Sequence, residues 1–208
     1  IAFIKNDIKD LTKITNIFLP RIINKRLNEI FEKGNLEGEF VIPFEPDGTM
    51  SKDYRFSGKI LNASINLTKK FSIKNLTAEI NYGKRVENNG FTALIRQGSV
   101  FDLELTDSTI SLKHGNNEMQ IKSSLRTNGK LGFSQIKTIA FLFGLNTNAF
   151  KDINGTVNLK TNINFDLGKN FKIKNLLYKT EGDISSLEIY TKENRTIKKY
   201  FPEYDPRI

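Results

Sequence analysis

Apolar and polar residues alternate over long stretches of this chain, and this alternation limits the folds that are open to it. The clearest stretch is residues 157–167, where apolar side chains occupy every second position apart from Thr161. Successive side chains of a β-strand point to opposite faces of the sheet, so the pattern predicts one apolar face and one polar face. At about 3.3 Å per residue this strand would span roughly 35 Å, which is long for a small domain.

Shorter stretches follow the same period of two. Strands are expected at residues 38–44, 61–67, 101–105, 110–112 and 119–121. Turns are expected at residues 107–108, 114–117, 128–129 and 154–155. The alternating apolar residues that we expect on one shared face are Leu61, Ile65, Leu67, Phe101, Leu103, Leu105, Val157, Leu159, Ile163, Phe165 and Leu167.

Two segments have helical spacing instead. Residues 16–33 place apolar side chains at helical intervals, and Gly34 is suited to a C-terminal cap. Residues 134–145 predict a second, mostly apolar helix with Ser134 as its N-cap. The expected organisation is a helical lead-in over residues 1–34 and a β section over residues 35–208 with the second helix as an insert.

A six-residue pattern, F-x-I-K-N-L, occurs twice. The copies are residues 71–76 and 171–176, an offset of 171 − 71 = 100. Each copy follows a glycine, Gly58 or Gly155, and a long alternating stretch. Repeated units that cannot bury an apolar face alone stack on their neighbours, so the repeat predicts an extended sheet.

Composition narrows the choice of function. Cysteine is absent, which excludes disulfides, thiolate metal sites and a cysteine nucleophile. The net charge of +9 is compatible with nucleic acid or an anionic membrane surface, but the lysines are spread along the chain, as on a solvated surface. No apolar run reaches the roughly 18–20 residues of a transmembrane helix.

The apolar faces of these strands must be covered, because leaving them in water costs about 25 cal/mol for each Å². The two predicted helices are too short to cover strands of this length. The predicted fold is mainly β with two short helices, its long antiparallel strands forming a curved, groove-like sheet. An open groove filled by acyl chains fits these elements, and so does a closed sandwich or barrel.

The order of several segments resembles one protein family. Residues 19–21 lead into the first helix and Gly34 precedes a strand. An F-x-G pattern at residues 56–58 and the F-x-I-K-N-L copies follow, and residues 153–155 precede the long strand. This order is similar to that of AsmA-like, YhdP-type bacterial envelope proteins. The resemblance covers most of residues 19–187 and is one of pattern and order rather than of an invariant catalytic motif.

The resemblance implies a fragment of a larger periplasmic protein of the cell envelope, anchored in the bacterial inner membrane outside this segment. Members of the family form taco-like sheets with an apolar inner surface and are implicated in moving phospholipid toward the outer membrane. Implied partners are phospholipid acyl chains and neighbouring groove sections of the same chain, with no nucleic acid, cofactor or enzymatic activity. The apolar residues named above would then contact lipid; otherwise they are plain core.

Other functions find little support in the residues. His114 is the single histidine and falls in a predicted turn, which favours a surface residue over a metal ligand or general base. Asp102 and Glu104 have the spacing of a glycosidase pair but lie on the polar side of their strand. The alternatives that remain are a scaffolding β-domain of the envelope without a lipid path, a basic nucleic-acid-binding β-domain, and an enzyme.

Overall fold

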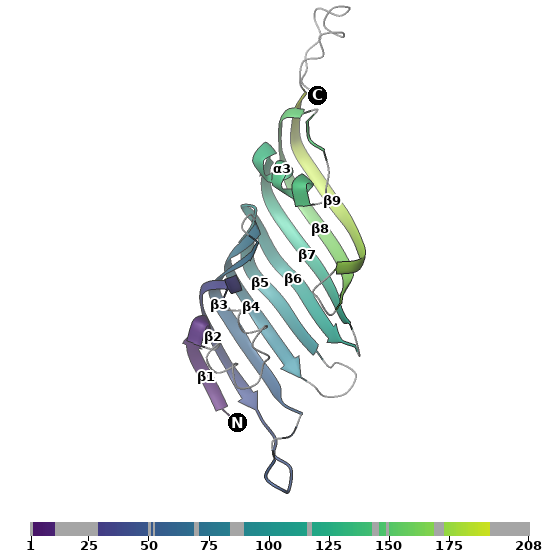
Figure 1. Cartoon of the computed structure of the whole chain (residues 1–208). Helices are drawn as coiled ribbons and strands as arrows, with labels where there is room; N and C mark the ends of the chain where they lie inside the picture. The colour runs from purple at the N-terminus through teal and green to yellow at the C-terminus, as the bar shows by residue number, and fades with distance from the viewer. Residues whose placement is uncertain are drawn as a thin grey trace, which may run out of the picture.

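In the part of the chain that the structure describes, nine strands form one antiparallel sheet and follow one another in sequence order (Figure 1). The computed structural model describes residues 2–10, 29–49, 51, 53–68, 71–83, 90–115, 118–142, 146–148, 150–168 and 173–191. The strands are β1 (Ala2–Asp7), β2 (Phe31–Val41), β3 (Arg55–Thr68), β4 (Phe71–Gly83), β5 (Gly90–Val100), β6 (Leu103–His114), β7 (Met119–Gly132), β8 (Phe150–Leu167) and β9 (Ile173–Thr191). One helix, α3 (Phe133–Leu142), connects β7 to β8.

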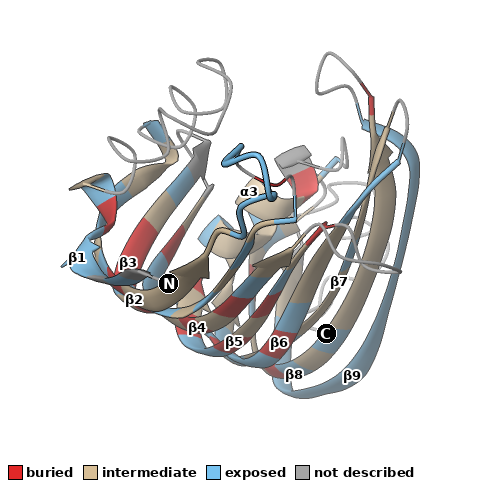
Figure 2. Cartoon of the chain, turned by 90° about the horizontal axis from the view of Figure 1, so that it is seen from below, coloured by how far each residue is buried: buried red, intermediate tan, exposed pale blue. Residues whose placement is uncertain are grey.

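The sheet is open and curved. Among the described strands, β1 and β9 occupy the two edges and do not pair with each other. Figure 2 shows the strands curving into a trough, with α3 lying inside the curve. Long strands accumulate right-handed twist, and β8 and β9 have 18 and 19 residues, so curvature is the expected result. The predicted fold class, a mainly β chain with long antiparallel strands in a curved, groove-like sheet, is confirmed.

The lead-in segment contains a strand that the sequence pattern did not predict. Residues 2–7 form β1, which pairs with β2, and helical residues are described at 8–10 and 29–30. Most of the helix predicted at residues 16–33 falls on residues 11–28, which lie outside the described residues.

The predicted end of that helix is wrong. Residues 31–33 already belong to β2, where Phe31 pairs with Ile65 of β3. Gly34 is therefore a strand residue and not a helix cap. Gly34 has a φ of 140°, which favours glycine. The lack of a side chain also lets its backbone pass close to Ala63, since a Cβ at Gly34 would lie 2.7 Å from the Ala63 Cα.

The second helix is confirmed, but it begins differently. α3 begins one residue before the predicted residues 134–145 and covers them as far as Leu142; residues 143–145 are not described. The Gly132 backbone N–H donates to Gln135 Oε1 at 3.2 Å, so Gln135 caps the first turn from inside the helix, as in a capping box. The predicted cap at Ser134 is wrong, because Ser134 lies within the helix and its carbonyl accepts from Thr138 Oγ1.

Two predicted turns are strand interiors. Residues 128–129 lie in β7 and residues 154–155 in β8, and the two strands pair without interruption from Met119 to Gly132. At Gly155 a Cβ would make only ordinary contacts, 3.5 Å from Ile184 and from Leu187 on β9, so a side chain could be placed there without strain. The strands are consequently longer than the turn signals indicated.

The loop between β5 and β6 has only two residues, Phe101 and Asp102, because Val100 pairs directly with Leu103. Both loop residues have left-handed φ angles, 53° and 61°. This is the conformation of a type I′ turn, whose twist matches that of the strands it joins. Phe101 therefore lies in a turn and not in the strand where its alternation with Leu103 placed it.

The F-x-I-K-N-L repeat is a repeated β-bulge. The first copy begins β4, and the described part of the second copy begins β9. Asn75 and Asn175 occupy the same place in the two copies and both have a φ of 51°. The pairing register shifts beside each of them. Asparagine enters the left-handed region more readily than most residues, which explains why it marks the bulge.

Another bulge replaces the turn predicted at residues 107–108. β6 continues through this position, and its register against β7 shifts between Thr106 and Thr109. Ser108 is buried, and its hydroxyl donates to the Thr106 carbonyl at 2.9 Å and accepts from the Arg126 N–H at 2.8 Å. The side chain thus replaces ladder hydrogen bonds that the bulge interrupts.

We expect Ser108→Ala to lower the free energy of unfolding by about 1–3 kcal/mol, because it removes the buried Ser108 hydroxyl and leaves the Arg126 N–H without this acceptor. Urea denaturation followed by circular dichroism measures the change. Ser111→Ala is the control on the same strand, since the Ser111 hydroxyl makes only a 3.4 Å contact to the Lys122 carbonyl. Equal effects of the two substitutions would contradict the role given to Ser108.

Candidate apolar groove

One face of the sheet carries apolar side chains in rows that run across the strands. Paired residues of antiparallel neighbours lie on the same face, so the pairing register defines each row. The first row is Phe40, Phe56, Tyr82, Phe91, Leu112, Ile121 and Phe165. The second row is Gly38, Gly58, Ile80, Ala93, Ile110, Ser123, Ile163 and Tyr178. We call this side of the sheet the apolar face.

Aromatic rings close one end of the apolar face. The Phe40 and Phe56 ring centroids are 6.3 Å apart, and those of Tyr54 and Tyr82 are 5.7 Å apart. The Phe56 ring lies over the glycine of the neighbouring strand, because a Cβ at Gly38 would be 2.6 Å from its tip. The missing side chain of that glycine is thus replaced by an aromatic one, as is common in sheets.

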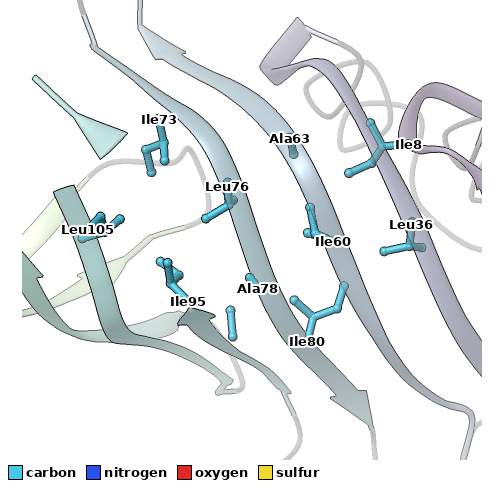
Figure 3. Packing of buried hydrophobic residues seen from close by; sticks show 11 residues of the cluster. Ile8, Leu36, Ile60, Ala63, Ile73, Leu76, Ala78, Ile80, Ile95 and Leu105 are labelled. Atoms are coloured by element: carbon cyan, nitrogen blue, oxygen red, sulfur yellow. The ribbon is translucent and has the colours of Figure 1, made fainter. Parts of the chain in front are cut away.

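The buried core lies on this face over β2 to β6. Figure 3 shows eleven of its side chains, contributed by these strands and by Ile8. Ile8 follows β1 and packs into the same cluster, so the segment after β1 supplies part of the cover. Small and branched residues, such as Ala63, Ala78 and Ile95, allow the close packing that buries them in a single layer of strands.

Cover decreases toward β9. In the second row Ile80 is 8% exposed, Ile163 is half-buried and Tyr178 is 58% exposed. Three rows further along β8, Val157 is buried but its partner on β9, Ile184, is 56% exposed. α3 contacts β7 and β8, so it covers only the end of this region. The described chain therefore leaves the β7–β9 part of the apolar face open.

The structure brings most of the predicted groove residues together. Those on the apolar face are Ile65, Leu103, Leu105, Val157, Leu159, Ile163, Phe165 and Leu167. Leu61 lies on the opposite face, because a bulge at Asn62 separates it from Ala63 and reverses the alternation. Phe101 lies in the β5–β6 turn, and the side chain of Leu67 is outside the described residues.

Sequence reasoning missed the contribution of β4 and β5. Ile73, Leu76, Ala78 and Ile80 on β4, together with Ile95 on β5, are among the most buried apolar residues. An alternating signal was available in residues 76–82, since Leu, Ala, Ile and Tyr occupy every second position there. The small side chain of Ala78 made this pattern less conspicuous than that of residues 157–167.

The opposite face is polar and carries exposed ion pairs. Arg96 reaches Glu79 at 3.3 Å and Asp107 at 3.8 Å, and Lys5 reaches Glu37 at 3.0 Å. Exposed pairs of this kind contribute little to stability. A shallow hollow of about 490 Å³ on this side is lined mainly by hydroxyl, amide and lysine side chains of β6 to β9, including Lys122, Asn164 and Lys179. The rest of its lining is Ile163, Leu177 and Tyr178.

Among the residues that the structure describes, no arrangement indicates metal binding or acid–base catalysis. No group of three or more His, Asp or Glu side chains there could hold a metal ion. His114 is exposed at the end of β6, and Asp102 and Glu104 are both exposed. None of the helices described is long and apolar enough to cross a membrane.

Comparison of the chain with models of protein families, with curated proteins and with solved structures finds no match. The fold and the surface chemistry are therefore the grounds for any statement about function.

At the aromatic end of the apolar face, Tyr82 is expected to ionise at a higher pH than a free tyrosine. Burial, together with the 3.4 Å hydroxyl contact to Tyr54, raises the pKa of Tyr82 to about 12. Because the folded-state pKa is raised, this stabilisation is present below pH 10 and is lost as the pH rises toward 12. The absorbance of tyrosinate, titrated in the native chain and in Tyr82→Phe, should differ by one group that ionises near pH 12. A difference centred near pH 10 would contradict this environment.

Proposed function

We propose that this chain is a section of a bacterial envelope protein that holds phospholipid acyl chains along its apolar face, as part of a path between inner and outer membranes. The observation that carries the proposal is the open part of that face over β7 to β9. Large exposed apolar surfaces on a protein mark sites of interaction with lipid, ligand or another chain.

The geometry of the open region suits an extended apolar ligand. β8 presents Leu159, Ile163, Phe165 and Leu167 on one side along its length, and the register from β7 to β8 has no bulge that would interrupt this side. Each buried CH₂ of an acyl chain would contribute about 0.8 kcal/mol. Neighbouring positions along the strand are chemically similar, so a chain would slide between them with small changes in free energy.

Substitution on β8 tests the proposal. Native mass spectrometry of the purified 208-residue chain, followed by lipid extraction, should detect co-purifying phospholipid. Ile163→Asp should lower the bound amount by about tenfold or more, because a carboxylate in an apolar groove loses its hydration. Ile163 is only half-buried, so the fold should tolerate the change.

Asn162→Asp is the matched control, because it adds the same charge at the next position, which faces the polar side of β8. Circular dichroism establishes that both variants remain folded. A native chain that is folded and free of lipid would contradict the proposal and favour a scaffolding β-domain. Equal loss of lipid in both variants would also contradict it, since it would point to charge and not to the apolar face.

A further inference from the structure

The free edge of β9 has a charge pattern that is complementary to itself. Among the described strands, β9 pairs only with β8, so the backbone groups of its other edge are open to another strand. Along β9, Lys174 and Lys179 come first, and Glu181, Asp183 and Glu188 follow them. An antiparallel copy of the same strand would bring the basic part against the acidic part.

In one pairing register, opposite charges face each other and every pair of facing residues lies on the same side of the sheet. If a two-fold axis passes through Glu181, then Lys179 lies opposite Asp183 and Lys174 opposite Glu188 of the second copy. These four residues share the polar face, because their partners on β8 are Asn162, Asn158, Asp166 and Asn154. A shift by one residue would place apolar side chains opposite polar ones.

The apolar side chains agree with the same register. Tyr178 would lie opposite Ile184, and Ile173 opposite Ile189 of the second copy, all on the apolar face. Tyr178, Ile184 and Ile173 are each more than half exposed in the single chain, so pairing would bury surface that is now in water.

The bulges of β9 also match. Asn175 and Ser186 have φ angles of 51° and 52°, and each introduces one extra residue relative to β8. In the register centred on Glu181, the bulge at Asn175 and Leu176 meets the bulge at Ser186 and Leu187 of the second copy. Two residues then face two residues, so the bulges leave the pairing in phase across the whole strand.

At the axis the two Glu181 carboxylates would approach each other. Each is accompanied by cations of its own chain, because Lys179 forms an ion pair with Glu181 and Lys160 is also near. These cations hold the pKa of Glu181 below its usual range. The repulsion at the axis is thus offset within each copy.

We propose that two copies of this chain associate through antiparallel pairing of their β9 strands, forming one continuous sheet with a shared apolar face. The interface is isologous, because the same strand contributes both sides. This inference concerns an edge and not the lining of the groove, so it stands or fails independently of lipid binding.

Sedimentation velocity over a range of concentrations tests the proposal with the full 208-residue chain. The expected result is a reversible monomer–dimer equilibrium. Lys179→Glu should weaken the dimer by about tenfold or more, because it sets a glutamate opposite Asp183 twice per dimer. Lys113→Glu on β6 is the control, with the same charge change at an exposed position remote from the edge.

Mixing makes the test specific for the register. Asp183→Lys alone should also weaken self-association, because two lysines would then face each other. A mixture of Lys179→Glu and Asp183→Lys chains should form a mixed dimer at least as readily as the native chain, since both facing pairs are again of opposite charge. A native chain that stays monomeric, assemblies larger than a dimer, or a mixture that does not associate would each overturn the proposal.

Discussion

Burial on one side of a single sheet is the constraint on which the rest of this structure depends. A single layer has no opposing sheet, so its apolar side chains must be hidden by their neighbours on the same face or by short covering segments. Over β2 to β6 this is achieved with closely packed small and branched residues and with Ile8 from the segment after β1. Over β7 to β9 only α3 contributes among the described elements, and its ten residues reach one end of long strands. The open surface that remains is the basis of the proposed lipid binding.

The alternating pattern predicted the class of fold and the strand at residues 157–167 correctly, because the period of a strand is a direct consequence of backbone geometry. It failed where a residue is inserted without breaking the strand. Asn62 reverses the faces of β3, which moves Leu61 to the polar side while Ala63 and Ile65 stay on the apolar side. The alternation of apolar and polar residues does not show where a β-bulge occurs. The asparagine repeated in the two F-x-I-K-N-L copies was nevertheless a signal of a bulge in each copy.

Glycine was the second source of error, since it was interpreted by its frequency in turns. Gly34 and Gly155 both lie in strands, and at Gly34 the backbone of Ala63 comes too close for a Cβ to be placed without displacement. Such a need arises from tertiary packing and has no local signature. The β5–β6 connection shows the opposite case, in which Phe101 and Asp102 form a tight turn without any glycine. Most of the groove residues could therefore be predicted as a group, but the face on which each individual residue lies could not.

The meander order of the strands has a consequence for how the chain folds. Each inner strand bonds to the strand before it and the strand after it, so strand pairing joins segments that are consecutive along the chain. The entropy lost in closing the short connections is small, and pairing can propagate from one hairpin to the next without waiting for a distant segment. Opening should likewise begin at an edge and advance strand by strand, with β9 exchanging its amide hydrogens before the strands of the buried cluster. For the same reason, a chain of this design can be widened by a hairpin without altering the connectivity of the strands already in place.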